Sequence, residues 1–232
     1  MAEVHDKVVG QTSGAKFEQV NMEFLQATFP RLQNLRPGQW HIEKLGNRNH
    51  LKTSSFVQYA VALNEYVRQN AELAASLGND YMVAPDVVIY RDPEEDNSIN
   101  SGENMVDGTT AKYTEIRKEN NSLPILHASI SAKWTIRSDR AQNSRTEALG
   151  LIRNRKGHLP HIVVVTGEPL PSRIASLALG TGDIDCVYHF ALPELQQAVL
   201  ETGAEDSIEM LKILVDGKRL KDISDLPLDL TM

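Results

Sequence analysis

Three charged side chains, Asp86, Lys133 and Glu147, have the types and spacing of a site that could cleave phosphodiesters. Asp86 follows a proline within one apolar stretch, and Lys133 ends the triplet S-A-K in a later one. Phosphodiester hydrolysis commonly uses a divalent cation held by carboxylate oxygens, beside a lysine that orients the attacking water or offsets charge on the phosphate. The pattern alone is weakly specific, because the three residues could equally be a strand-end acid, an edge lysine and a solvated helix glutamate.

The position two residues before the lysine holds a serine, Ser131. Nucleases with an acid-x-Lys strand place a carboxylate there, and a hydroxyl cannot supply its charge. Glu147 is the substitute that the sequence offers. It lies nearly two helical turns after Arg140, about 10 Å along the same helix face. A carboxylate there can reach back to the end of the strand, so we expect Asp86, Lys133 and Glu147 to converge.

The stretch from Ser129 to Arg155 must position this chemistry. Apolar and polar residues alternate up to Arg137, which predicts a strand. Ser138 is a suitable N-cap for a helix that follows and runs to Arg155.

The rest of the chain alternates between the two kinds of element. Other strands are predicted at Trp40–Leu45, Tyr81–Arg91, Pro160–Gly167 and Asp185–Ala191, and the strand through Lys133 is expected to begin at Leu123. Other helices are predicted after a polar turn with Ser13 as N-cap, and at Ser54–Leu77, Ser172–Leu179, Pro193–Glu201 and Glu205–Leu214. The acidic segment Asp92–Ser122 is predicted to be mostly loop, with a short helix at Thr110–Lys118. This order predicts an α/β fold in one domain, residues 1–232, with a mixed β-sheet flanked by helices.

Composition sets limits on the partners. The 232-residue chain has a formal net charge of -7, yet seven basic residues and only two acidic ones lie between Lys133 and Lys156. Such a local basic surface is sufficient for nucleic acid, because the footprint decides binding. Cys186 is the only cysteine, which fits a reducing compartment. The sequence shows no signal peptide and no apolar run of the ~18 residues that a membrane span needs, so we expect a cytoplasmic protein with no membrane partner.

Arg137, Asp139 and Arg140 flank the start of the predicted helix. Arginine can bridge both major-groove acceptors of guanine, and a carboxylate can accept from the cytosine amino group. The three residues are therefore a sufficient set for reading G·C pairs. The alternative is an acidic helix start with arginines that serve solubility. Arg155 is interpreted as a phosphate or surface charge.

The chain resembles the type II restriction endonucleases that cut sites with a central CCGG. The resemblance is carried by ILHASISAKWTIRSDRAQNSRTEALGLIRNRKGHLPHIVVVTGEPLPSRI, ALGTGDIDCVYHFAL and GKRLKDISDLPLDL, with GQTSGAKFE and LRPGQW near the start. It implies a restriction-endonuclease-like PD-(D/E)XK fold, with Asp86, Lys133 and Glu147 as the catalytic set and Mg²⁺ as the cofactor. It adds Glu18 as a further acid near that site and the main-chain carbonyl of Ala132 as a metal ligand.

The same resemblance implies how DNA is read and with which partners. The RSDR run (Arg137, Asp139 and Arg140) would read CCGG in double-stranded DNA, Gln11 would lie in the minor groove and Arg173 would read the outer pairs, giving GCCGGC as the site. Cutting after the first base would leave 5′ overhangs. A homo-oligomer, at least a dimer and in these relatives a tetramer, and a cognate DNA methyltransferase are expected. Two alternatives stay open: a repair nickase of the same fold, and a DNA-binding module that has lost catalysis.

Overall fold

The computed structural model describes residues 2–45, 53–59, 85–136, 138–180 and 182–232, and for 2–12 and 138–141 the backbone alone. Its centre is a six-stranded mixed sheet in the order β1-β2-β3-β4-β5-β6. The strands are β1 (Trp40–Lys44), β2 (Val87–Arg91), β3 (Ile125–Lys133), β4 (His161–Thr166), β5 (Cys186–His189) and β6 (Leu220–Asp222). β1 pairs with β2 and β2 with β3 in antiparallel fashion, whereas the pairs from β3 to β6 are parallel. The predicted mixed α/β sheet is confirmed.

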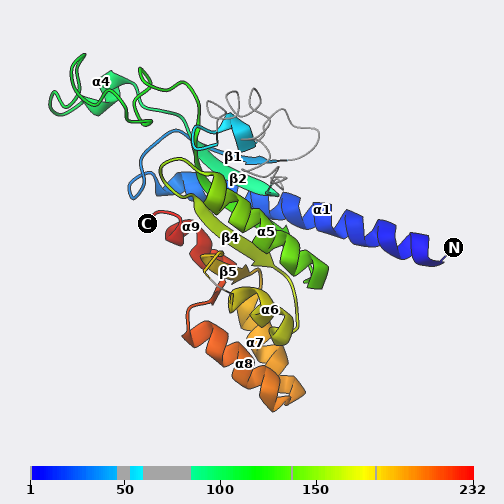
Figure 1. The fold of residues 1–232 in the computed structure, drawn as a ribbon. Helices are drawn as coiled ribbons and strands as arrows, with labels where there is room; N and C mark the ends of the chain where they lie inside the picture. Colours follow the sequence, from blue (N-terminus) through cyan, green and yellow to red (C-terminus); the bar gives the residue numbers. More distant parts are fainter. Residues whose placement is uncertain (1, 46–52, 60–84, 137, 181) are drawn as a thin grey trace.

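Helices cover both faces of this sheet (Figure 1). The elements on one face are α5 (Ser138–Asn154), α6 (Pro171–Ala178), α7 (Leu192–Thr202) and α8 (Glu205–Asp216), which share one hydrophobic cluster with side chains from all the strands from β2 to β6. The elements on the other face are α1 (Ala2–Thr28) and α9 (Leu226–Asp229), which share a second cluster with Ile42 of β1 and with the opposite side chains of β2 to β5. The strands from β2 to β5 therefore contribute to both cores, which explains their nearly continuous apolar sequences.

β3 is buried between two neighbours, and its alternation decides which side chains meet which helices. Ala128 and Ile130 point into the cluster beneath α1. Ser131 lies on the opposite side, toward α5. An irregularity in the β2–β3 register next to Ile89 reverses this order near Leu126, which joins the α5 side. The strand ends at Lys133. Residues 134–136 are not part of it, so the predicted continuation of the strand beyond Lys133 is wrong for these three residues, and Arg137 lies outside the described residues.

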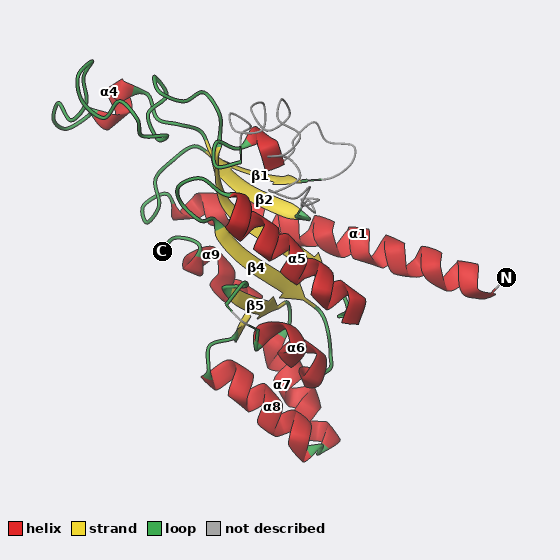
Figure 2. Ribbon diagram, viewed as in Figure 1, coloured by secondary structure: helices red, strands yellow, loops and turns green. Residues whose placement is uncertain are grey.

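The first helix is longer than its pattern predicts. α1 runs unbroken through Gly10 and Gly14, where a polar turn is expected from the sequence, so Ser13 is inside the helix and not its cap. Glycine inside a helix costs only about 1 kcal/mol. Burial of Phe17 and Leu25 against the sheet can offset that cost. In Figure 2 the N-terminal half of α1 extends beyond the edge of the sheet.

Segment 92–122 folds as an arm fixed by one buried arginine. Arg117 is 2% exposed and donates to the carboxylates of Asp96 and Glu119 and to the carbonyl of Thr110. These bonds close the segment around α4 (Asp96–Ile99), so the helix predicted at Thr110–Lys118 is absent and turns occupy that stretch.

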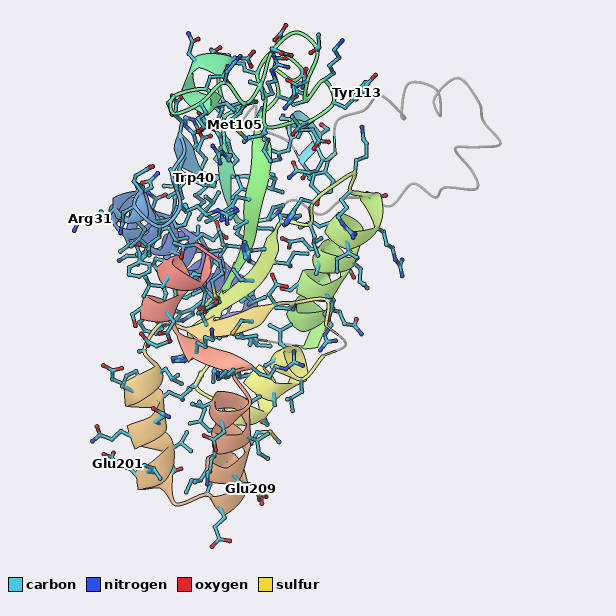
Figure 3. All side chains as sticks on the ribbon, turned by 90° about the vertical axis from the view of Figure 1, so that its left-hand side faces the viewer. Arg31, Trp40, Met105, Tyr113, Glu201 and Glu209 are labelled. Carbon is cyan, nitrogen blue, oxygen red and sulfur yellow. The ribbon has the colours of Figure 1, made fainter. Side chains whose placement is uncertain are left out.

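The arm occupies one end of the molecule. Figure 3 shows Met105 and Tyr113 on the arm, far from Glu201 and Glu209 on α7 and α8 at the opposite end.

Two other predictions have mixed outcomes. The strand predicted at Tyr81–Arg91 begins at Val87 within the described residues, after Pro85 and Asp86. Residues 60–77 of the helix predicted at Ser54–Leu77 lie outside the described residues, and Thr53–Ser55 is a 3-10 turn. The short edge strand β6 has no counterpart in the predicted elements. None of the helices in the described ranges combines the length and hydrophobicity needed to cross a bilayer.

Candidate active site

Asp86 and Lys133 meet where β2 and β3 pair. The ladder between the two strands ends at Val87 opposite Ile130, and Asp86 lies just beyond it. One carboxylate oxygen of Asp86, Oδ2, accepts the backbone N–H of Ala132 at 2.8 Å and Nζ of Lys133 at 2.7 Å. The Asp86 side chain therefore takes the place of the next backbone acceptor in the β2–β3 pairing, and the same oxygen binds Lys133. Since β3 lies between β2 and β4, the interpretation of Lys133 as an edge-strand lysine is wrong.

Glu147 extends this pair from the helix side. It lies on α5, is 6% exposed, and accepts no hydrogen bond from any described residue. Burial raises the pKa of the Glu147 carboxyl to about 8; the negative charge of Asp86 contributes in the same direction and Lys133 opposes it. The three predicted catalytic side chains are thus within electrostatic reach of one another, and a solvated helix face for Glu147 is excluded.

A pair of buried hydroxyls connects β3 to α5 beside this group. The Oγ atoms of Ser131 and Ser144 lie 3.2 Å apart. Ser144 precedes Glu147 by three residues, which is one turn of the helix. The contact fixes the height of α5 above the strand and hence the position of Glu147. Ser131, which stands where the acid usually lies, therefore faces α5, the helix that carries Glu147.

Two carboxylates and a lysine in a partly buried site fit a divalent cation. Burial is the main cause of the raised pKa of Glu147 and the negative charge of Asp86 adds to it; a bound cation would offset both effects. Within the described ranges no group of three or more His, Cys, Asp and Glu side chains could hold a metal. Mg²⁺ can use two carboxylates because it retains several waters. Asp86 and Glu147 are therefore the residues that could hold it.

Glu18, the further predicted acid, has another partner. Its carboxylate lies 2.8 Å from Nζ of Lys44. Lys44 is the last residue of β1 and pairs with Val87, so it lies next to Asp86 along the sheet. The structure thus places Glu18 near the end of β2 but joins it to Lys44, a residue that the sequence analysis missed. The only signal for Lys44 was its place next to the end of the strand predicted at Trp40–Leu45.

The residues expected to contact bases are described to different extents. Arg137 lies outside the described residues. Asp139 and Arg140 lie in the first turn of α5 and Gln11 lies in α1, each described for its backbone alone. Arg173 lies on α6; its side chain is 52% exposed, and Nη1 lies 3.6 Å from Oε1 of Glu168.

A buried network holds the chain between Lys133 and α5. Thr166 donates its hydroxyl to the carbonyl of Lys133 at 2.8 Å, and Glu168 accepts the backbone N–H of Ile136 at 2.7 Å. A Cβ at Gly167 would lie 2.8 Å from the ring of Trp134, so this close approach requires glycine. Sequence analysis missed these residues. Their only signal is that they directly follow the apolar strand β4.

Known proteins show which family the chain belongs to. A family model described as NgoMIV restriction enzyme matches residues 1–232. The type II restriction enzyme NgoMIV of Neisseria gonorrhoeae is 54% identical over 231 residues, which cover 99% of this chain and 81% of that protein. The chain belongs to the NgoMIV restriction enzyme family. Its activity class is that of a type II restriction endonuclease, as the resemblance implied.

Two solved structures are similar at a lower level. The pre-specific restriction endonuclease BsaWI–DNA complex has a TM-score of 0.40 and 13% identity, covering 94% of this chain and 71% of that one. The Bse634I restriction endonuclease has a TM-score of 0.42 and 14% identity, covering 94% and 77%.

Proposed function

We propose that the chain hydrolyses double-stranded DNA at GCCGGC in a Mg²⁺-dependent reaction that leaves 5′-phosphate ends and 5′ overhangs. The observation that carries this proposal is the convergence of Asp86, Lys133 and Glu147 from two strands and a helix. Asp86 and Glu147 would hold the ion, together with the carbonyl of Ala132. When bound, Mg²⁺ stabilises charge on the phosphate and acidifies the attacking water.

Each side chain of the site has a separate task. Lys133 is held at 2.7 Å from Asp86, with part of its side chain open to solvent, so its ammonium group can donate to a phosphate oxygen or orient a water. Asp86 positions the strand end through the N–H of Ala132 while its second oxygen stays available. Burial raises the pKa of the Glu147 carboxyl to about 8, so positive charge bound beside it would favour its ionised form near neutral pH. Glu18 is assigned a supporting role beside Lys44.

Base reading is assigned to residues around α5 and α6. Arg137, Asp139 and Arg140 read the central CCGG from the start of α5, Arg173 reads the outer pairs from α6, and Gln11 contacts the minor groove. Placement on two neighbouring helices supports this assignment, because their N-terminal ends lie at the same end of the sheet as Lys133 and Thr166. Arginine and carboxylate groups match the major-groove edges of G·C pairs.

Partners follow from the symmetry of the site. A palindrome is read by a two-fold dimer, and we propose a homotetramer made of two such dimers. We also propose that the chain is one domain, which the sheet shared by both hydrophobic clusters supports. An endonuclease of this specificity requires a cognate methyltransferase that protects the host DNA, and we assign both to the cytoplasm.

One experiment separates this proposal from its two alternatives. A plasmid with a single GCCGGC is incubated with the protein, with Mg²⁺ or with chelator. Restriction activity gives linear DNA with 5′ overhangs at that site, only with Mg²⁺. Nicked circles alone would indicate a repair nickase, and uncut plasmid that nevertheless binds the protein would indicate a module without catalysis. Cutting at unrelated sites would contradict the proposed specificity.

A further inference from the structure

Glu168 is the most deeply buried carboxylate of the described residues, with 1% of its surface exposed. Both of its oxygens are used. Oε2 accepts the N–H of Ile136 at 2.7 Å; Oε1 accepts the N–H of Leu170 at 3.2 Å and lies 3.6 Å from Nη1 of Arg173. Burying a carboxylate is costly unless donors and a positive charge surround it. This one is surrounded by groups from two separate parts of the chain.

These two parts are the ones that carry the base-reading residues. Ile136 is 2% exposed and lies two residues before α5 begins. Leu170 is the residue that precedes α6, the helix that carries Arg173. One rigid carboxylate therefore fixes the start of α5 relative to the start of α6.

The backbone around Glu168 is itself fixed on both sides. Its N–H donates to the hydroxyl of Thr166, whose own proton goes to the carbonyl of Lys133. Its carbonyl accepts from Nε2 of His189 at 3.2 Å. The backbone of Glu168 is thus fixed to the ends of β3, β4 and β5. Its carboxylate is therefore held in place by the sheet and not by α5 or α6.

We propose that Glu168 is a positioning residue for specificity: it holds Arg173 in register with the start of α5, so that outer and central base pairs are read together. This inference rests on the proposed function. It assigns no contact with DNA to Glu168, which acts through Arg173 and through the N–H of Ile136. Its removal is expected to relax specificity before it affects the catalytic group.

The variant Glu168→Gln tests this inference because it keeps the size of the side chain. The single amide oxygen can accept the shorter bond from Ile136, but the neutral group no longer attracts Arg173 or accepts from Leu170. Cleavage rates are compared for duplexes containing GCCGGC, ACCGGT with a changed outer pair, and GCATGC with a changed central pair. Discrimination against ACCGGT is expected to fall about tenfold, and discrimination against GCATGC to change less than about threefold.

Asp183→Asn is the matched control. Asp183 is also a buried carboxylate, and it lies 3.8 Å from an arginine of α5, Arg145, but it contacts neither Ile136 nor Arg173. This variant should keep both discrimination ratios. Glu168→Asp is a second variant, in case the glutamine unfolds the protein: it retains a carboxylate too short to reach both helices, and the same loss at the outer pair is expected. Thermal unfolding is measured for every variant.

A double-mutant cycle with Arg173→Ala gives the decisive comparison. If Glu168 acts through Arg173, the double variant loses no more outer-pair discrimination than Arg173→Ala alone. Additive losses, unchanged discrimination in Glu168→Gln, or an equal loss in Asp183→Asn would overturn the inference while the proposed function stands. A wild-type protein that does not prefer GCCGGC would overturn both.

Discussion

The hydroxyl of Ser131 lies 3.2 Å from the hydroxyl of Ser144, one helical turn before Glu147. The strand position that usually carries the second acid therefore faces the helix that carries Glu147, the acid proposed to replace it. This contact indicates that the two positions, Ser131 and Glu147, converge on one region beside Asp86.

That convergence predicts the result of exchanging the two residues. Glu147→Ser alone should abolish cleavage, and Ser131→Glu with Glu147→Ser should recover part of it, because the carboxylate returns from the strand to the same region. Recovery should stay incomplete, since an error of about 1 Å in a catalytic group can cost about 100-fold. Cleavage rates of the two variants decide the matter. No gain in the double variant, with its fold intact by circular dichroism, would show that the two positions do not converge.

Base reading is tested by arginine variants at and beyond the start of α5. Arg140→Ala or Arg137→Ala should lose about 1–3 kcal/mol of discrimination at one guanine per half-site. Arg155→Ala, which removes an exposed arginine beyond the end of α5, should weaken binding to all sequences alike and reduce its salt dependence. Binding is measured with cognate and single-substitution duplexes at several salt concentrations. A uniform loss in Arg140→Ala would contradict a base-reading role.

Metal exchange provides an independent prediction. Cleavage should require Mg²⁺ or Mn²⁺, while Ca²⁺ should support specific binding with little cutting, because Asp86 and Glu147 offer only hard oxygen ligands beside Lys133. Binding and cleavage of one duplex are compared in each ion after chelation. Efficient cutting in chelator would exclude a metal-dependent reaction.

Acid sensitivity of the fold is expected from His127. Burial lowers the pKa of His127 from 6.5 to about 3, and Nε2 is engaged with the carbonyl of Leu230 at 2.7 Å. Below pH 6.5, His127 is therefore protonated more readily in the unfolded chain than in the folded protein. The free energy of unfolding should fall as the pH drops from there toward about 3, by at most about 1.4 kcal/mol per pH unit from this residue.

Chemical denaturation at several pH values measures this effect. His127→Gln, whose amide can still donate to Leu230, should show a smaller loss of stability between pH 6.5 and pH 4. His158→Gln, a change at an exposed histidine, serves as the control and should keep the wild-type slope. Equal slopes in all three proteins would mean that His127 is not buried in its neutral form.

The sequence predicts this fold well where a signal is local. The apolar runs of β3 and β4 are recognisable because burial on both faces leaves a pattern a few residues long, and α5 begins at Ser138, where the sequence predicts the start of a helix. The arm is not predictable in this way, because Arg117 joins groups up to 21 positions away. The start of α1 is missed because Gly10 and Gly14 favour a turn in the sequence pattern, although each costs only about 1 kcal/mol inside a helix.

The residues of the candidate site also fall into those that the sequence identifies and those that it does not. Asp86, Lys133 and Glu147 are identifiable by their chemistry and by resemblance to known enzymes. Lys44, Ser144 and Glu168 are not, because their roles come from contacts across the sheet that no spacing encodes. Ordinary polar residues acquire these roles only when the fold has brought them together.

The shared carboxylate site is the central claim, and Glu147→Ala tests it most directly. Cleavage of a GCCGGC duplex in Mg²⁺ and its binding in Ca²⁺ are measured for Glu147→Ala, for Asp86→Ala, and for Glu201→Gln as an exposed control on α7. Both alanine variants should keep specific binding but lose more than about 100-fold in cleavage rate. Loss of a residue that only supports a metal ligand typically costs about 10- to 100-fold. The control should cut normally. Near-normal cleavage by Glu147→Ala would contradict the account and would make Glu18 the partner of Asp86.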